Sequence, residues 1–264
     1  MNQSNKRKKI IITGVSSGIG YSIVSLLSSR NDVEIIGLGR NNIDSQPSNY
    51  KFIEVDLGNS NSIPKVINLL KDEQVDIFIN NAGVGFRGTI EDLSIENIRK
   101  QFEINYFGPT ELLKSLIPKL RSNQGIVINL AALGSLLDIP TFGYYEISKL
   151  AFSKTLDILN EESEIKVANI YLGAVKSSFG KNIIETINIE NSIYKSLYEE
   201  WQIRFRNFFS DRNKAEDVAK LVESIIFESN RSQFVSYRDK VLAFCKCHLP
   251  KRLFNIVLKY FYKL

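Results

Sequence analysis

Short apolar runs alternate with longer segments of mixed polarity along most of the chain. Runs rich in isoleucine and valine occupy residues 9–13, 33–38, 50–55, 75–80, 125–130 and 165–172. Apolar residues recur at the spacing of one helix face over residues 18–30, 60–73, 94–120, 143–162, 192–209 and 214–229. Runs that are apolar throughout are typical of parallel strands buried on both faces. The alternation predicts an α/β fold, a single doubly wound Rossmann-like parallel sheet with helices on both faces, over residues 1–237.

Two segments depart from this regular pattern. Pro109 falls inside the segment 94–120 and is expected to kink that helix, because proline lacks the backbone N–H of a helix interior. Residues 238–264 form a basic amphipathic tail, with no acidic residue from Lys246 onwards. A helical tail of this kind suits an anionic membrane interface, and it suits docking on its own domain or on a partner subunit equally well.

Charge and cysteine content narrow the classes of partner. The formal net charge is +5, but nine basic residues lie within residues 6–9 and 246–264, and 25 basic against 29 acidic residues remain elsewhere. The main domain is therefore not expected to bind nucleic acid. Cys245, Cys247 and His248 offer three metal ligands at most, so no metal site is expected. Two cysteines and the lack of a membrane-spanning apolar run predict a cytoplasmic protein, with the tail as the segment for any peripheral membrane contact.

A glycine-rich turn follows the first apolar run and opens the first helix. It reads Thr13-Gly14-Val15-Ser16-Ser17-Gly18-Ile19-Gly20. Glycines there let the backbone approach a pyrophosphate closely, while N–H groups at the helix N-terminus point at it. The alternative is a loop that only needs positive φ angles. Its place between the first strand and a helix favours a dinucleotide-binding turn.

With this turn the chain resembles the short-chain dehydrogenase/reductase family, whose glycine signature is TGxxxGxG. Asn80-Asn81-Ala82-Gly83 matches the family's NNAG, and Tyr145-xxx-Lys149 matches its YxxxK. The resemblance covers roughly residues 8–235. It implies cofactor contacts from Gly14, Ser16, Ser17, Gly18, Ile19, Gly20, Arg40, Asp56, Leu57, Asn81, Ala82, Gly83, Tyr145, Lys149, Gly173, Val175 and Ser177.

The end of the second apolar run bears on the choice of dinucleotide. Gly39 occupies the position where NAD-preferring members of the family carry an aspartate, and Arg40 follows it. A carboxylate there would repel a 2′-phosphate, whereas a guanidinium can pair with one. We therefore expect NADP(H) to be favoured over NAD(H). The alternative is that Arg40 is only a solvated loop charge.

Tyr145, Lys149 and Asn105 correspond to three of the family's four catalytic positions. An ammonium one helical turn from a phenol favours the phenolate, so Lys149 is expected to lower the pKa of Tyr145. The resemblance implies that Tyr145 is the general acid for reduction or the base for oxidation. It also implies that Lys149 holds the nicotinamide ribose and that Asn105 anchors a water in the proton relay.

The fourth catalytic position, a serine in the family, is Ala132 here. The family pattern SSxxG reads Ala131-Ala132-Leu133-Gly134-Ser135. Losing one hydrogen-bond donor to the substrate oxygen typically costs about 3 kcal/mol. Three hypotheses follow: Ser135 supplies the missing hydroxyl, the substrate uses its own polar group or reaches Asn105 or the Tyr144 hydroxyl, or hydride transfer is no longer the task.

Residues 178–210 cover the substrate in the family. They are rich in aromatic side chains, namely Phe179, Tyr194, Tyr198, Trp201, Phe205, Phe208 and Phe209. These suit a bulky hydrophobic substrate, or they pack on the domain as an ordinary helix. The preferred hypothesis is an NADP(H)-dependent oxidoreductase acting on a carbonyl or alcohol of a hydrophobic small molecule. The alternative is a non-redox cyclisation or isomerisation, or a partner-subunit role. The resemblance also implies a homodimer or homotetramer formed through residues 94–120 and 143–162.

Overall fold

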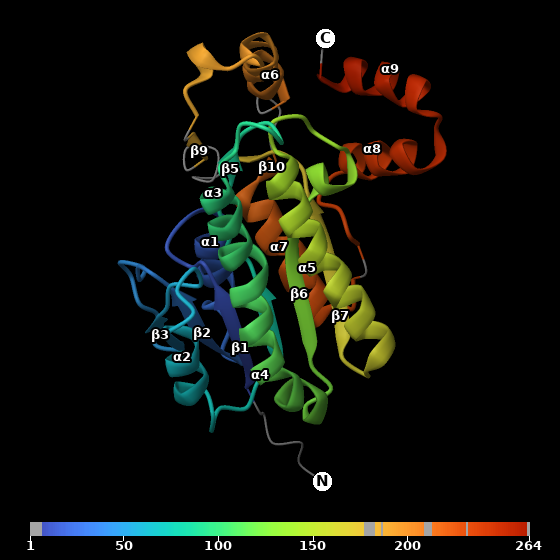
Figure 1. Cartoon of the computed structure of the whole chain (residues 1–264). Coiled ribbons are helices and arrows are strands. Elements are labelled where there is room, and N and C mark those ends of the chain that lie inside the picture. Colours follow the sequence, from blue (N-terminus) through green and yellow to red (C-terminus); the bar gives the residue numbers. More distant parts are fainter. Residues whose placement is uncertain (1–6, 177–182, 186, 209–212, 231, 263–264) are drawn as a thin grey trace.

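The apolar runs form one six-stranded parallel sheet with the strand order β3-β2-β1-β4-β6-β7 (Figure 1). The computed structural model describes residues 7–176, 183–185, 187–208, 213–230 and 232–262. The strands of this sheet are β1 (Lys8–Thr13), β2 (Val33–Gly39), β3 (Tyr50–Glu54), β4 (Ile77–Asn80), β6 (Ile126–Ala132) and β7 (Lys166–Leu172). The predicted doubly wound α/β fold is confirmed. The strand order reverses between β1 and β4, which is where such sheets bind ligands.

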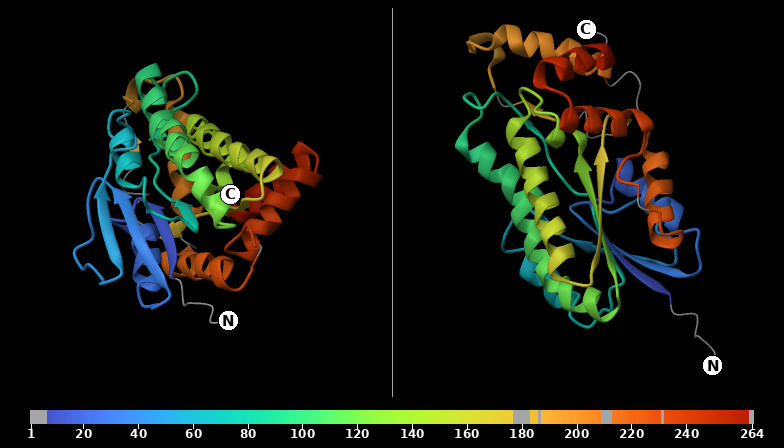
Figure 2. Two further views of the ribbon diagram at one scale, coloured as in Figure 1. Left: turned by 90° about the horizontal axis from the view of Figure 1, so that it is seen from below. Right: turned by 90° about the vertical axis from the view of Figure 1, so that its right-hand side faces the viewer.

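Helices cover both faces of the sheet (Figure 2). One face packs against α1 (Gly18–Leu27) and α7 (Ala215–Phe227), and the other against α2 (Ile63–Leu69), α4 (Gly108–Ser122) and α5 (Gly143–Glu162). In β1, Ile10 and Ile12 join the first core while Ile11 joins the second. Successive strand residues point to opposite faces, so a strand buried on both sides must be apolar throughout.

The segment predicted as one long helix is interrupted before its proline. It forms α3 (Ile95–Phe102), a π-helical turn (Glu103–Phe107) and then α4, with Pro109 in the first turn of α4. Pro109 has no N–H to donate to the carbonyl of Asn105, four residues earlier. The distortion therefore takes the form of a π turn that carries Asn105, and not a kink in the middle of the helix.

Among the described residues, four strands of two residues each and two short 3-10 helices were not predicted. β5 (Phe86–Arg87) pairs with β9 (Ile184–Glu185), and β8 (Val175–Lys176) pairs with β10 (Asn213–Lys214). A 3-10 helix, η2 (Leu133–Leu136), follows β6, and another, η4 (Ile189–Asn191), precedes α6 (Lys195–Phe208). Elements this short contain less than one period of any hydrophobic pattern, so the sequence holds no readable signal for them.

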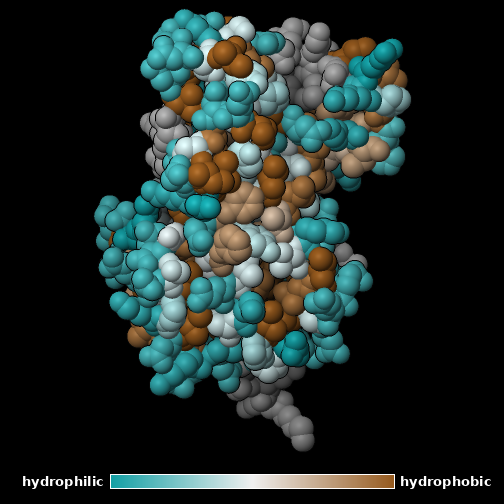
Figure 3. Space-filling view, in the orientation of Figure 1, coloured by the Kyte–Doolittle hydropathy of each residue, from teal (hydrophilic) through white to brown (hydrophobic). Residues whose placement is uncertain are grey.

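The basic tail forms two helices and docks on its own domain. Helices α8 (Tyr237–His248) and α9 (Lys251–Tyr262) lie with α6 above the carboxyl ends of the strands (Figures 1 and 2). Leu242 and Phe254 are buried in a third core with Leu133 and Trp201. Over the upper part of the molecule, where α6, α8 and α9 lie, Figure 3 shows apolar side chains mixed with polar ones. Among the described helices, none combines the length and apolar content needed to cross a membrane.

A chain of buried asparagines crosses three neighbouring strands. The side-chain amide of Asn80 donates to Asn129 Oδ1 at 3.0 Å, and that of Asn129 donates to Asn169 Oδ1 at 2.9 Å. Asn169 in turn donates to Asp157 on α5 at 2.8 Å. The three asparagines are paired in register across β4, β6 and β7, and none is more than 3% exposed. Each asparagine therefore provides a hydrogen-bond partner for the next, which buried amide groups require.

Candidate active site

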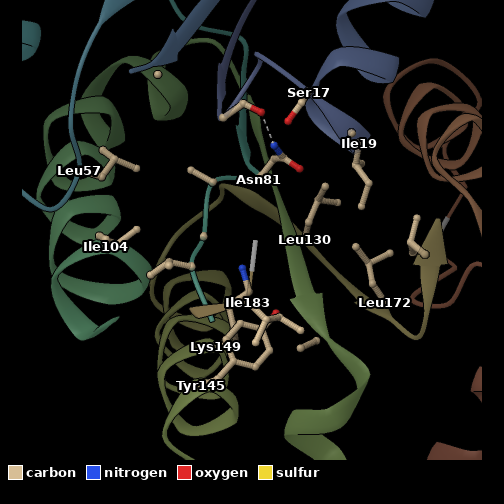
Figure 4. A pocket seen from close by; sticks show the side chains of 18 of the residues that line it. Ser17, Ile19, Leu57, Asn81, Ile104, Leu130, Tyr145, Lys149, Leu172 and Ile183 are labelled. Carbon is tan, nitrogen blue, oxygen red and sulfur yellow. Dashed lines mark hydrogen bonds between the residues drawn. The ribbon is translucent and has the colours of Figure 1, made fainter. Parts of the chain in front are cut away.

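A cavity of about 690 Å³ opens at the carboxyl ends of the strands, next to the point where the strand order reverses. The glycine turn, the ends of β2 and β4, and the first turns of α5 line it. Figure 4 shows Ser17 and Ile19 at one end of the cavity and Tyr145 and Lys149 at the other. The topology therefore brings the two sequence motifs to a single site.

The glycine turn passes very close to the loop after β4. Gly14 has φ +74°, and a Cβ atom there would lie 2.9 Å from Ala82 Cα. A Cβ on Gly20 would lie 2.1 Å from the Gly14 carbonyl oxygen. Only glycine fits either position. Gly14, Ser16, Ser17, Gly18 and Ile19 line the cavity, whereas Gly20 lies behind the turn, outside the lining, and serves its packing.

Asn81 ties the glycine turn to the loop after β4. Its side-chain amide donates to the carbonyl oxygens of Gly14 and Thr13 at 2.8 and 2.9 Å, and Figure 4 draws the bond to the turn. Thr13 Oγ1 accepts the backbone N–H groups of Asn81 and Ala82, both at 3.0 Å. These hydrogen bonds fix the position of the glycine turn relative to the loop after β4. Asn81, Ala82 and Gly83 of that loop border the cavity.

The end of β2 and the loop after β3 form the far end of the cavity. Gly39, Arg40, Asp56 and Leu57 all line it, and Arg40 is exposed. A Cβ on Gly39 would meet its nearest atoms at 3.7 Å or more, so a side chain fits there without strain. An elongated cavity with a glycine cradle and a cation at its end fits a nicotinamide dinucleotide in an extended conformation.

Tyr145 and Lys149 lie one helical turn apart at the start of α5, beside the cavity (Figure 4). Gly83 lies beside Lys149, since a Cβ on Gly83 would be 3.4 Å from Lys149 Nζ. Burial lowers the pKa of Lys149 to about 8. Burial, and then the neighbouring Glu146 carboxyl, raise the pKa of Tyr145. The expectation that Lys149 lowers the pKa of Tyr145 is therefore wrong for this structure, because desolvation of the phenolate dominates.

The Asn105 side chain is fixed by its neighbours. Its oxygen accepts the Val84 N–H at 2.9 Å, and its amide donates to the Val84 carbonyl at 2.9 Å and to Ser148 Oγ at 3.0 Å. Asn105 is buried and does not line the cavity. The side chain thus holds the π turn against the start of the cavity wall, next to Lys149.

Comparison with known proteins agrees with this geometry. A family model described as "short chain dehydrogenase" matches residues 8–188. The chain belongs to the short-chain dehydrogenase family. Enzymes of this family are oxidoreductases that use a nicotinamide dinucleotide.

This short-chain dehydrogenase is similar to several proteins over most of its length. It is 27% identical to a 3-ketodihydrosphingosine reductase of Bacteroides thetaiotaomicron over 266 aligned residues, which cover 96% of the chain and 97% of that protein. It is 28% identical to the probable short-chain type dehydrogenase/reductase VdlC of Helicobacter pylori, with 80% and 81% covered. A short-chain dehydrogenase structure from Streptomyces avermitilis superposes with a TM-score of 0.80 at 22% identity, covering 97% of this chain and 96% of that chain.

Ala132 lines the cavity of this dehydrogenase, but the proposed substitute hydroxyl does not. Ser135 Oγ donates to the Ala132 carbonyl at 2.6 Å within η2, and neither Ser135 nor Tyr144 is among the lining residues. This geometry does not support the hypothesis that Ser135 replaces the serine, because its hydroxyl is used inside its own turn. The geometry likewise gives no support to the hypothesis that the substrate reaches the Tyr144 hydroxyl.

The cavity wall formed after β7 is tied to the tail, a link that sequence reasoning missed. Gly173 and Val175 line the cavity, and Ser177 lies outside the described residues. Asp239 on α8 is buried, accepts a hydrogen bond from Asn213 Nδ2 at 3.1 Å and contacts the Gly173 backbone. The sequence signal for this contact was Asp239 itself, the single acidic residue in the basic tail of residues 238–264.

The described aromatic residues of the substrate segment pack on the domain. Tyr198 is 1% exposed, and its hydroxyl accepts the Thr89 N–H and donates to Asp92 Oδ2, both at 2.8 Å. Trp201 joins the third core, and the Tyr194 hydroxyl donates to Glu91 at 2.6 Å. None of these three lines the cavity, where Ile183 lies instead. Phe179 and Phe209 lie outside the described residues, as do the side chains of Phe205 and Phe208.

Proposed function

We propose that this short-chain dehydrogenase is an NADP(H)-dependent reductase of a ketone carried on a long-chain hydrophobic molecule. The observation that carries this proposal is the wall beside Tyr145, where the lining side chains of Leu133, Leu137, Ile139 and Phe142 are all apolar. Such a wall favours an alkyl chain over a sugar or another polar substrate. The relative that matches over 96% of the chain is named for a long-chain ketone, which supports the same class.

In this proposal, residues of the chain bind the dinucleotide, orient the substrate and donate a proton to it. The bound dinucleotide supplies the hydride. The glycine turn would hold its pyrophosphate, Arg40 its 2′-phosphate and Lys149 its nicotinamide ribose. Tyr145 would donate its phenolic proton to the substrate oxygen as the carbonyl is reduced. The Asn105 carbonyl, which Pro109 cannot bond, is the acceptor that would hold a relay water.

Ketone reduction is tested by following NADPH oxidation with 3-ketodihydrosphingosine as the probe. We expect turnover with this probe, and little with a short ketone that carries the same polar end. NADPH binding without turnover of any ketone would contradict the proposal and favour the non-redox alternative. Apart from Ala132, no described residue favours that alternative.

The cofactor preference is tested at Gly39. Gly39→Asp is expected to shift the ratio of NADPH to NADH affinity by about a hundredfold towards NADH, because a carboxylate there repels a 2′-phosphate and accepts from a 2′-hydroxyl. Fluorescence titration of both dinucleotides measures the ratio. Asn61→Asp makes the same charge change at an exposed position outside the lining and should leave the ratio unchanged. An unchanged ratio in Gly39→Asp would contradict our placement of the 2′-phosphate.

We also propose that the enzyme self-associates through α5. Ile147, Leu150 and Ile158 are exposed and share one face of that helix. Exposed apolar side chains gathered on one face favour a protein interface. Sedimentation velocity should give a dimer or tetramer for the wild type and a smaller species for Leu150→Asp. The control Leu69→Asp, at an exposed site on α2, should sediment like the wild type. A monomeric wild type would contradict this proposal.

A further inference from the structure

One polar side chain interrupts the apolar wall on the side of Ala132. Beside Ala132 the lining consists of Leu133, Gly134, Leu137, Ile139 and Phe142, and the carboxyl group of Glu146 lies among them. Glu146 follows Tyr145 in the first turn of α5 and is only 6% exposed. A carboxyl group in such surroundings needs a physical reason, because burying one is costly.

The Glu146 carboxyl is held by the backbone that follows Ala132. Its Oε2 accepts the Ile139 N–H at 3.0 Å. Its Oε1 sits against Gly134, where a Cβ atom would lie only 2.5 Å away. No described residue forms a hydrogen bond to this second oxygen. One oxygen is therefore fixed as an acceptor. The other lies against Gly134, which lines the cavity two residues after Ala132.

The surroundings favour the neutral form of this carboxyl. Burial, and to a smaller extent the Asp138 carboxylate, raise the pKa of Glu146 to about 9. The Ile139 N–H and the Lys246 ammonium on α8 act in the opposite direction. Lys246 also forms an ion pair with Asp138. Tyr145, the titratable neighbour on α5, has a pKa raised above its ordinary value and carries no charge at pH 7 that would oppose this. A carboxyl that stays protonated at neutral pH can donate a hydrogen bond.

We propose that Glu146, as a neutral carboxylic acid, donates through Oε1 the hydrogen bond to the substrate oxygen that Ala132 cannot supply. This proposal rests on the proposed ketone reduction. Glu146 keeps its own proton throughout. It only donates a hydrogen bond to the carbonyl oxygen as the carbonyl is reduced, while the transferred proton comes from Tyr145. The Ile139 N–H fixes the other oxygen, so the donor is preorganised in the way that stabilises developing negative charge.

The sequence around η2 fits this role. The family pattern has a serine where Ala132 stands and a glycine where Ser135 stands, whereas here the glycine is Gly134. Any side chain at 134 would occupy the space of Glu146 Oε1. Ala132, Gly134 and Glu146 thus line one wall of the cavity.

The activity test separates hydrogen-bond donation from mere support of η2. With 3-ketodihydrosphingosine as probe, Glu146→Leu is expected to lower kcat on the order of a hundredfold while NADPH still binds. Glu146→Gln should lose less than tenfold, because an amide accepts from Ile139 and still donates. Adding Ala132→Ser to Glu146→Leu should recover at least about tenfold. Glu161→Leu, at an exposed position on the same helix, is the matched control and should match the wild type.

The competing explanation is that Glu146 only braces the loop. In that case Ala132→Ser would not rescue Glu146→Leu, and Glu146→Gln would fall as far as Glu146→Leu. Either result overturns the proposal, as does a Glu146→Leu variant that stays within threefold of the wild type. Thermal unfolding of each variant identifies any variant whose loss is only a loss of folding.

A second readout needs no turnover. Infrared difference spectra between wild type and Glu146→Gln at pH 7 should contain the C=O stretch of a protonated carboxyl, and the band should disappear as the pH passes about 9. Absence of this band at pH 7 overturns the proposal whatever the substrate. If the band is present but wild type reduces no ketone, the proposed function fails instead. If the band is present but does not shift when 3-ketodihydrosphingosine and NADP⁺ are added, the donor role of Glu146 is overturned.

Discussion

Tyr145→Phe is expected to lower the rate of ketone reduction on the order of a thousandfold while leaving NADPH binding intact. The variant removes one oxygen, the only group on this side chain that can donate a proton. The ring itself should stay in place, because it packs edge-on against Phe142 with centroids 6.1 Å apart. Single-turnover oxidation of bound NADPH measures the step directly, and a fluorescence titration confirms that the dinucleotide site is unchanged.

Tyr144→Phe is the matched control for this prediction. Tyr144 is the preceding residue on α5 and carries the same hydroxyl, but it does not line the cavity. Its variant should reduce ketones at the wild-type rate. A Tyr145→Phe enzyme that keeps more than a tenth of the activity, or a Tyr144→Phe enzyme that loses it, would show that the proton comes from elsewhere.

Asn129→Leu is expected to lower the free energy of unfolding by about 3–5 kcal/mol, although the new side chain has nearly the same shape. The change leaves the Asn80 amide without its acceptor and Asn169 Oδ1 without its donor, and both groups are buried. Each stranded polar group costs about 1–3 kcal/mol. The Ser153 hydroxyl also loses the bond that it accepts from Asn129 at 3.1 Å. Urea unfolding of the dinucleotide-free protein, with the midpoint and slope fitted together, measures the difference.

An exposed asparagine provides the comparison for this stability measurement. Asn68 lies on the outer side of α2, so Asn68→Leu makes the same chemical change in water and should alter the stability by no more than about 0.5 kcal/mol. If Asn129→Leu matched Asn68→Leu, the hydrogen bonds of the buried asparagines would contribute no net stability.

The sheet and the main helices were predictable because they follow from local periodicity. The helix over 143–162 was predicted with its observed bounds, and all six long strands were predicted where they occur. The glycine turn, Tyr145 and Lys149 came from spaced motifs. The break of the tail into α8 and α9 lies at Leu249 and Pro250, and Pro250 was a signal that the sequence offered.

The features that were missed depend on contacts distant in sequence. Asp239 meets Gly173 only after the tail has folded back, and Glu146 is notable only because α5 brings it to the wall beside Ala132. The direction of the Tyr145 pKa shift was mispredicted for the same reason. The sequence spacing shows that Lys149 lies one helical turn from Tyr145. It does not show how deeply Tyr145 is buried, because burial depends on the whole fold, and burial has the larger effect on this pKa.

The buried asparagines also bear on how the chain avoids misfolding. Strands such as β1, β4 and β6 are almost uniformly apolar, so sliding one strand by two residues along its neighbour keeps the same residues on the same face and sacrifices little hydrophobic burial. Only the native offset lets Asn80, Asn129 and Asn169 meet. A slipped sheet would enclose unpaired amides and reopen readily. The three residues thus favour the correct alignment of β4, β6 and β7, and refolding without them should yield trapped, aggregation-prone pairings of these strands.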